Sequence, residues 1–386
     1  MVVYIVGFGI SVFLFAAMPK IKKTQQKYVA IVALFIPCMI AGLRANTVGV
    51  DIGIYLEPLT SAAIEAEGIL DYFNSNFWQN WRYLYVYEYE YGFALLVYFC
   101  AKLAGNIYFV QFSVQLLTIL PVYFALKKNN GGFPLWVGML AYYLMFYNTS
   151  LNTMRQCIAV SFCFLALQYF RDGNIKKYIL FQIVALLFHY SAIVGLVTSA
   201  LFYYIYGNPT KREQIVRGDS ELNIRVLLAS VIALVTLFGA TTLTRILTYL
   251  GLGRFEGYIS GDISYMPNQI ITRLPIILLC FWNWKKLEKN NIYFKFHFAM
   301  LICSVILAQF TSVNAQAGRI CSYFEIFYLE LLPKIFSINR YKHSGKIKIS
   351  AASLLVIGFM MFYWWFFFVY RGTSSTVPYI VGEIWQ

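Results

Sequence analysis

Arg155 lies in the stretch SLNTMRQCIAVSF, residues 150–162, at the start of a segment that stays largely apolar as far as Phe170. No carboxylate lies within seven residues of it on either side, so it has no ion-pair partner nearby in the sequence. Asn152, Arg155 and Gln156 follow the i, i+3, i+4 spacing, which puts them on one helical face. A charge in an apolar segment must be compensated. A guanidinium is suited to bind an oxygen-rich anion such as phosphate, so this face is a candidate anion site.

The elements that position this face are predicted to be membrane helices. Of the 386 residues, 60% are hydrophobic, 19% are aromatic and only 12% are charged, whereas soluble domains are about one-quarter charged. The apolar residues come in blocks about as long as a bilayer is thick. We therefore predict an all-α, polytopic integral membrane protein in which residues 1–386 form a single membrane domain.

The net charge of +14 does not indicate a nucleic-acid partner. Most lysines lie in short links such as KIKK, NIKK and WKKLEK, which is typical of cytoplasmic loops. The expected partner of the surface is the lipid bilayer.

The lysine-rich links also set the direction of each crossing. Twelve crossings are predicted, with long outer loops at 44–90 and 244–268. Segment 91–103 has only thirteen residues and carries Lys102, so we expect a re-entrant or interfacial helix that returns to the outer face. The stretch 178–207 is expected to form two short helices that meet near His189. The predicted spans are 2–18, 28–43, 107–126, 133–150, 154–170, 178–190, 191–207, 226–243, 269–284, 292–310, 319–336 and 349–370.

Arginines and lysines separate under this topology. Lys102 is the one lysine expected at the outer face, whereas eight arginines lie at or near it: Arg44, Arg82, Arg155, Arg245, Arg254, Arg273, Arg319 and Arg371. Arginine offers a planar fork of donors that binds phosphate bidentately and tolerates desolvation better than an ammonium group. Each arginine could instead pair with Asp51, Glu57, Glu90, Glu256 or Asp262, or extend to lipid headgroups. For the set as a whole, an anionic ligand is the favoured hypothesis.

Other polar residues are expected at the same face. Asp51, Glu90 and His189 are the candidates for accepting a proton, and His189 is favoured because the ordinary pKa of histidine, about 6.5, suits that task. Asp51 and Glu90 would then position the substrate and the arginines. The candidate substrate-binding residues are Tyr55, Asn152, Gln156, Tyr258 and Tyr323.

Tyrosines occupy every second position from 83 to 91 in the run WQNWRYLYVYEYEYG. This alternation predicts an extended stretch with one aromatic face. It indicates the aromatic belt of a membrane protein or, alternatively, a platform on which sugar rings stack. Glu88 and Glu90 form an E-x-E pair, which is a weak metal signal, so no metal is assigned. No P-loop, HExxH, GxSxG or dinucleotide fingerprint is present, and no cofactor is expected.

The order of several short motifs resembles that of the EpsG / Wzy-type polysaccharide polymerases. These motifs are GLRANTVGVDIGIY, YEYGF, NTMRQCIAVSF, LLFHYSAIV and AGRICSYF, followed by a late LLP, and together they span roughly residues 40–335. The resemblance implies a multi-pass glycosyltransferase of the cytoplasmic membrane that makes O-antigen, capsule or exopolysaccharide. Its substrate would be undecaprenyl-pyrophosphate-linked oligosaccharide, as donor and acceptor, at a site facing the periplasm or cell exterior. A chain-length regulator would be a further membrane partner.

The resemblance assigns roles to residues by position. Arg44, Arg155, Arg254, Arg273 and Arg319 would hold the pyrophosphate, which is a good leaving group whose departure needs charge stabilisation. The alternatives are a flippase for lipid-linked saccharides and an outer-face glycan ligase. A transporter often shows an internal repeat with polar residues near the midplane. Here the polar residues gather on one side and no repeat is evident, which favours an enzyme.

Overall fold

The computed structural model describes residues 1–79, 81–128, 132–207, 224–225, 265–312, 318–338, 340–343 and 346–382. The chain divides into two compact units, each built from several segments. Unit 1 comprises residues 1–166, 179–192 and 357–386, and unit 2 comprises residues 167–178 and 193–356. Most of the predicted second outer loop, 244–268, and the whole predicted span 226–243 lie outside the described residues.

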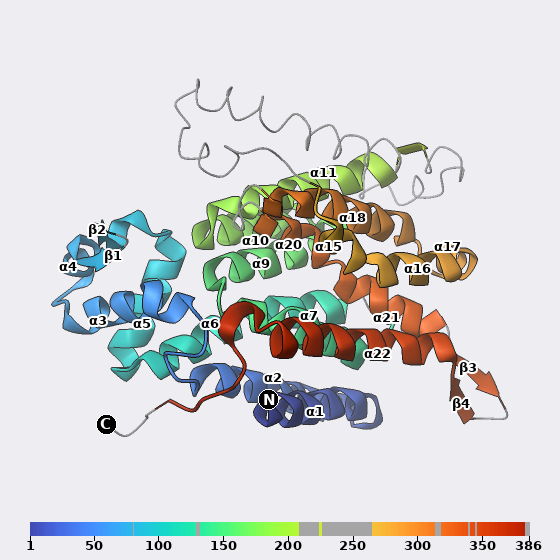
Figure 1. Ribbon diagram of the computed structural model, residues 1–386, viewed down its shortest axis with the longest axis horizontal. Coiled ribbons are helices and arrows are strands. Elements are labelled where there is room, and N and C mark those ends of the chain that lie inside the picture. Colours follow the sequence, from blue (N-terminus) through green and yellow to red (C-terminus); the bar gives the residue numbers. More distant parts are fainter. Residues whose placement is uncertain are drawn as a thin grey trace. The chain divides into compact units, whose positions relative to one another are not determined.

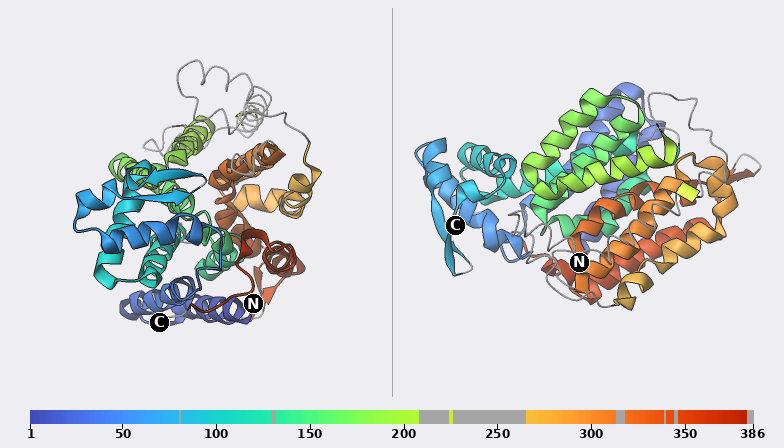
Figure 2. Two further views of the ribbon diagram at one scale, coloured as in Figure 1. Left: turned by 60° about the vertical axis from the view of Figure 1, so that its left-hand side comes forward. Right: turned by 90° about the horizontal axis from the view of Figure 1, so that it is seen from above.

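Unit 1 is built on long apolar helices (Figures 1 and 2). Helix α1 packs along α2, α2 packs on α6, and α7 packs on α1. The helices α3 and α5 pack together beside α6. The elements are α1 (Val2–Ala17), α2 (Lys23–Gly42), a π-helical turn (Ile52–Leu56), α3 (Glu57–Glu65), α4 (Ile69–Asn74), β1 (Asn76–Gln79), β2 (Arg82–Tyr85), α5 (Tyr91–Ala104), α6 (Ile107–Lys128), α7 (Leu135–Met145), α8 (Tyr147–Ser150), α9 (Met154–Arg171, as far as residue 166), α10 (Ile175–Phe188, from residue 179) and α22 (Ala351–Trp364, from residue 357).

Unit 2 is also helical, and α18 is its centre. This helix packs against α11, α20 and α21, and α21 packs against α16 and α17. The elements of the unit are α11 (Ile193–Tyr206), α15 (Pro267–Ile271), α16 (Leu274–Trp282), α17 (Trp284–Asn290), α18 (Phe294–Leu307), α20 (Ser322–Glu325), α21 (Tyr328–Ile338), β3 (Arg340–His343) and β4 (Lys346–Ile349), with the adjoining ends of α9, α10 and α22.

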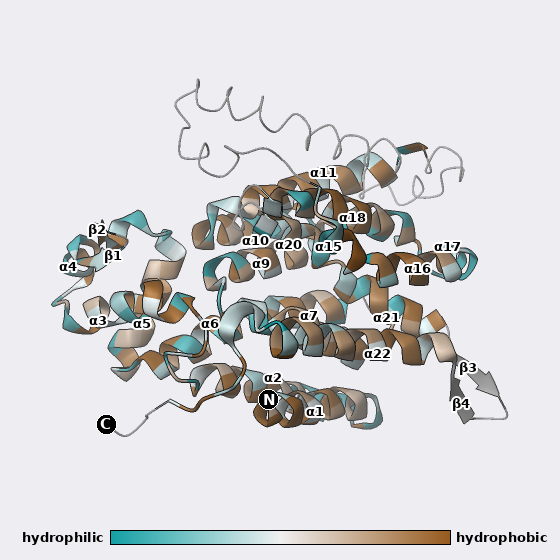
Figure 3. Ribbon diagram, viewed as in Figure 1, coloured by the Kyte–Doolittle hydropathy of each residue, from teal (hydrophilic) through white to brown (hydrophobic). Residues whose placement is uncertain are grey.

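Within the described part of the chain, five helices are long and apolar enough to cross a membrane: Val2–Lys20, Lys23–Gly42, Ile107–Lys128, Phe294–Ser312 and Ala351–Tyr370. Three shorter apolar helices cover Tyr91–Ala104, Leu135–Met145 and Tyr190–Tyr206. Figure 3 shows hydrophobic residues along α1 and α18 and hydrophilic residues at the turn between α1 and α2 and at α17. The prediction of a helical membrane protein is confirmed, whereas the number of twelve crossings stays a prediction.

The structure also refines individual elements. A break near His189 was predicted, and α10 and α11 are indeed separated by the short 3₁₀ turn Tyr190–Ala192. The predicted span 133–150 is divided into α7 and α8 at Phe146. The two hairpins β1–β2 and β3–β4 depart from a purely all-α class. The tyrosine-rich run is extended only as far as Tyr85, because residues Val86–Glu88 turn into a 3₁₀ helix.

The last described segment of the chain supports the loop that follows α2. The backbone N–H groups of Ala45 and Gly49 donate to the carbonyls of Ile380 and Ser375, at 2.9 and 3.0 Å. Gly49 has φ of 99°, and a Cβ there would lie 2.8 Å from the Asn152 side-chain oxygen. A glycine is therefore required for this loop to lie against the start of α9.

Candidate active site in unit 1

Arg155 has a carboxylate partner that is 65 residues away in the sequence. Its Nη1 donates to Oε2 of Glu90 at 2.5 Å. The guanidinium carbon also lies 4.8 Å from the centre of the Tyr55 ring and 5.1 Å from that of Tyr89, which adds cation–π attraction. The Arg155 side chain keeps 25% of its surface exposed and that of Glu90 keeps 12%. The sequence left a protein carboxylate, a lipid headgroup or an anionic ligand as possible partners of Arg155. In this structure the partner is the Glu90 carboxylate, and the Arg155 side chain stays partly exposed.

Glu90 is positioned by the start of α5. It is the N-cap residue of that helix, where the helix dipole favours a negative charge. Gly92, two residues later, lies so close to α10 that a Cβ would meet the Leu187 carbonyl oxygen at 2.6 Å. The glycine in YEYGF therefore allows the first turn of α5 to touch the end of α10, next to His189. Nothing in the sequence pattern alone had singled out Gly92.

His189 completes a group of three at this point. Its Nε2 lies 3.9 Å from Oε1 of Glu90, and this oxygen is buried with no hydrogen-bond partner among the described residues. On the other side of the ring, the backbone N–H of Ser191 donates to Nδ1 at 3.1 Å, and the Ser191 hydroxyl lies 2.7 Å from the same nitrogen. A backbone N–H can only donate, so Nδ1 accepts and the neutral ring carries its proton on Nε2, facing Glu90.

Asp51, Tyr55 and Asn152 form a second polar group beside Arg155. The Tyr55 hydroxyl donates to Oδ2 of Asp51 at 2.8 Å and lies 3.2 Å from the Asn152 carbonyl oxygen. The Asn152 amide accepts from the Val50 N–H at 2.7 Å and donates to the Ser374 carbonyl. Burial and the nearby Asp51 charge hold the pKa of Tyr55 well above its usual value. Tyr55 therefore remains a protonated donor that links Asp51 to the face of Arg155.

Arg44 is used by the fold itself. Its side chain is buried, with 1% of its surface exposed. It donates to the carbonyls of Ala41, Val48 and Leu151 at 2.7, 3.3 and 3.2 Å. These bonds tie the end of α2 to the turn before α9. The Arg44 guanidinium is thus buried against backbone carbonyls, whereas a quarter of the Arg155 side chain is exposed.

The other predicted site residues are distributed over both units and the part of the chain that the structure does not describe. Gln156 is buried, at 8% exposure, one residue after Arg155. Arg273, Arg319 and Tyr323 belong to unit 2, while Arg254 and Tyr258 lie outside the described residues.

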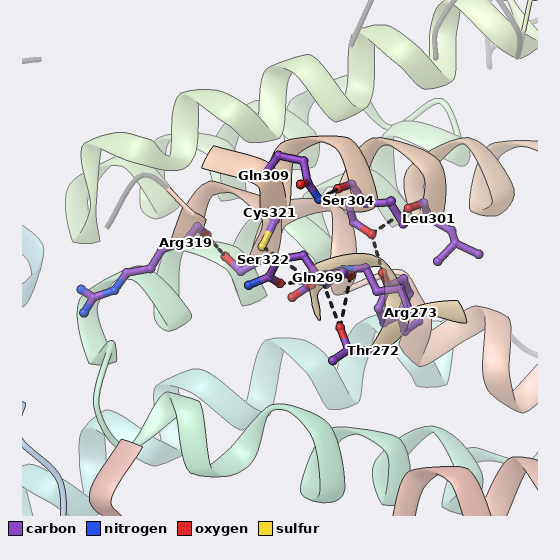
Figure 4. A network of polar contacts seen from close by, with 12 residues as sticks. Gln269, Thr272, Arg273, Leu301, Ser304, Gln309, Arg319, Cys321 and Ser322 are labelled. Atoms are coloured by element: carbon purple, nitrogen blue, oxygen red, sulfur yellow. Dashed lines mark hydrogen bonds and ion pairs between the residues drawn. The ribbon is translucent and has the colours of Figure 1, made fainter. Parts of the chain in front are cut away.

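In unit 2, Arg273 takes part in a network of its own. It donates to Glu325 and, through Nη1, to the Gln269 carbonyl and side-chain oxygens at 2.7 and 2.9 Å. Figure 4 shows the exposed Arg319 side chain pointing away from Arg273. Tyr323 is buried, with 2% of its surface exposed. Within unit 2, then, Arg273 and Arg319 do not face one common point.

Unit 2 also contains a buried charged cluster that was not predicted. Glu330 accepts from Gln168 Nε2 at 2.7 Å and from Arg171 Nη1 at 2.9 and 2.8 Å, and His297 contacts its second oxygen. The Arg171 guanidinium lies within 5.8 Å of four ring centres: Phe202, Tyr293, Phe296 and Phe327. The sequence does contain a signal for this cluster, because its three ionisable residues lie inside or at the edge of apolar segments.

Comparison with known protein families gives a match over most of the chain. The model of the EpsG family matches residues 27–381, nearly the whole chain. No curated protein and no solved structure matches the chain.

Proposed function

This chain belongs to the EpsG family, a family of Wzy-like polymerases, and we propose that it is a membrane glycosyltransferase that polymerises lipid-linked oligosaccharide repeat units. The donor is a growing saccharide on undecaprenyl pyrophosphate, and the acceptor is the next lipid-linked unit. The glycosyl–phosphate bond of the donor breaks, and a hydroxyl oxygen of the acceptor forms the new glycosidic bond. The products are the lengthened chain on the acceptor lipid, undecaprenyl pyrophosphate and one proton.

The observation that carries this proposal is the partly buried group Glu90–Arg155–His189. Pyrophosphate departure requires a cation that tolerates desolvation, and Arg155 is such a cation, partly exposed and braced by two tyrosine rings. The acceptor hydroxyl requires a proton acceptor within hydrogen-bond reach. Glu90 Oε1 is a carboxylate oxygen without a partner among the described residues, and it lies beside that cation.

Within this proposal Glu90 takes the proton and His189 orients Glu90. The Ser191 N–H occupies Nδ1, so the neutral imidazole presents a donor and not a lone pair to Glu90. The order of preference from the sequence, with His189 as the base, is therefore reversed in our proposal. Asp51 and Tyr55 hold the face of Arg155, and Asn152 anchors the loop that carries them.

We further propose that the site faces the periplasm or cell exterior from the cytoplasmic membrane. The support is the placement of lysine-rich links on the opposite side of the predicted topology. A chain-length regulator fits as a membrane partner, since a polymerase that adds units one at a time sets no length by itself.

The test is the glycan profile of a deletion strain complemented with single variants. Deletion should abolish long chains and leave single lipid-linked units at the outer face. Glu90→Gln should behave like the deletion at normal protein level, because the amide cannot take up the proton. Glu65→Gln is the matched control, since it makes the same acid-to-amide change at an exposed position on α3 of the same unit.

Two results would contradict the proposal. Accumulation of lipid-linked units at the inner face of the deletion strain would indicate a flippase. Full-length polymer from Glu90→Gln would remove Glu90 as the proton acceptor.

A further inference from the structure

The hairpin β1–β2 presents paired aromatic rings on its exposed face. Trp78 and Tyr83 face each other across the two strands, with ring centres 5.0 Å apart, and are 59% and 61% exposed. Tyr85 and Tyr87 stack with centres 5.1 Å apart and planes at 18°. Leu84, between Tyr83 and Tyr85 in the strand, points to the opposite, buried side. The exposed rings thus form two adjacent pairs, which we call the ring face.

The surroundings of the ring face are polar. Asn76, paired with Tyr85, is exposed on the same face of the hairpin. Arg82, on the strand that carries Tyr83 and Tyr85, forms an ion pair with Glu88 at 3.2 Å, with 63% and 31% of their side chains exposed. The hairpin is a sheet of two strands, and the unpaired edges of such a sheet cannot lie in hydrocarbon. The rings therefore meet water next to charged and amide groups. A sugar residue has this chemistry, since its C–H face stacks on a ring while its hydroxyls bond to neighbouring polar groups.

The face of the hairpin opposite the ring face packs toward the candidate active site. Phe77, in β1, lies 6.0 Å from Tyr89 by ring centres, and the Tyr89 hydroxyl reaches the Gln79 side-chain oxygen at 3.4 Å. Tyr89 in turn packs on Arg155. Tyr87 precedes Glu90 by three residues, so their Cα atoms are at most ~11 Å apart. The ring face therefore approaches Glu90 through Tyr87, and a saccharide stacked on Tyr85 and Tyr87 is within reach of that carboxylate.

We propose that the ring face is a saccharide-binding subsite that holds sugar residues of the substrate next to Glu90. The role of the subsite in polymerisation rests on the proposed function. The binding itself does not, because a sugar-binding face can be measured without any transfer reaction.

The experiment is a binding titration with the purified full-length protein in detergent. The probe is a set of lipid-free oligosaccharides obtained by partial acid hydrolysis of the producing strain's own polysaccharide. The double variant Trp78→Ala/Tyr83→Ala should weaken binding about ten-fold or more, because it removes one ring pair. Tyr28→Ala is the matched control, since Tyr28 is 59% exposed but lies on α2, close to the lysine-rich link KIKK, and the affinity of this variant should equal that of the unaltered protein.

Equal affinity in all three proteins, or no binding by any of them, would overturn the proposal. A second measurement tests the aromatic belt as the alternative. The protein and its Trp78→Phe variant are placed in vesicles of phosphatidylglycerol with brominated acyl chains. The difference between their fluorescence is the emission of Trp78, and we expect the bromine atoms not to quench it. Strong quenching of that emission would place the ring face in the bilayer and would also overturn the proposal. Oligosaccharide binding by a protein that fails to polymerise would contradict the proposed function alone.

Discussion

Replacing Glu330 with glutamine tests whether the buried cluster of unit 2 holds that unit together. Both carboxylate oxygens of Glu330 are used by donors, namely Gln168, Arg171 and His297. Glutamine has nearly the same shape, but it removes the negative charge and turns one acceptor into a donor. The new NH₂ group would face an N–H donor of Arg171 or His297, and the Arg171 charge would remain buried among aromatic rings.

The expected loss is large because the ion pair is buried. Glu330 has no exposed surface and the Arg171 side chain has 2%. Removing one partner of a buried ion pair costs about 3–5 kcal/mol, since the other charge is left uncompensated. For a unit of roughly 150–250 residues this corresponds to a fall in Tm of roughly 6–20 °C. The same principle predicts that Arg171→Leu/Glu330→Leu, which removes both charges, recovers part of the loss.

Thiol-reactive fluorescence gives a direct assay of unfolding in detergent. All seven cysteines lie in the described part of the chain and none of them forms a disulfide there, and three of the buried ones, Cys280, Cys303 and Cys321, are in unit 2. Asp172→Asn is the control, because it makes the same acid-to-amide change at an exposed position next to Arg171. A surface ion pair is worth only about 0–1 kcal/mol, so the control should move Tm by a few degrees at most. If Glu330→Gln has the same Tm as Asp172→Asn, the cluster does not stabilise the unit and the reasoning is refuted.

Three further predictions concern the arginines and the topology. Arg155→Lys should lower polymer yield about ten- to hundred-fold at normal protein level, because the ammonium loses the fork geometry; near-normal yield in the glycan profile would make the residue structural. Arg44→Lys should instead lower Tm through the lost carbonyl bonds and leave the polymer made per folded molecule unchanged, and reduced specific activity at full stability would reverse that assignment. In a cysteine-free background, single cysteines at Asn76 and Asn106 should react with an impermeant thiol reagent from outside and one at Asn290 should not. Labelling of Asn106 only after permeabilisation would require the topology to be redrawn.

Hydropathy predicts most helices well because the apolar segments of the sequence and the helices cover nearly the same residues. The predicted segments 91–103 and 107–126 correspond to Tyr91–Ala104 and Ile107–Lys128. Hydropathy does not show where a helix breaks inside an apolar segment. The block 133–150 breaks at Phe146, next to Tyr147, whose hydroxyl bonds the Pro37 carbonyl at 2.6 Å on a distant helix. A tertiary contact of this kind leaves no trace in local hydropathy.

The tyrosine run shows a different limit. Alternation correctly predicts an extended stretch around Tyr83 and Tyr85, since a period of two places rings on one face. It does not predict that the chain reverses at Trp81, where φ is 63°. A positive φ at a tryptophan is uncommon, and the usual turn signal, a glycine, is absent from WQNWRY. The single aromatic strand expected from the sequence is therefore a hairpin whose second face packs on Tyr89.

The arginines show why residue type and predicted side alone do not define a ligand site. Arg44, Arg155 and Arg273 were equivalent by sequence, because each lies at the outer end of an apolar segment. Their surroundings differ: Arg44 is buried against backbone carbonyls, Arg273 is held by Glu325 and Gln269, and Arg155 pairs with Glu90 while a quarter of its side chain stays exposed. Only an accessible guanidinium can exchange its protein partner for a phosphate. Under the proposed function, the pairing of Arg155 with Glu90 has a consequence beyond charge compensation. A pyrophosphate bound to Arg155 would share the guanidinium charge, and Glu90 would become a better proton acceptor before the leaving group departs.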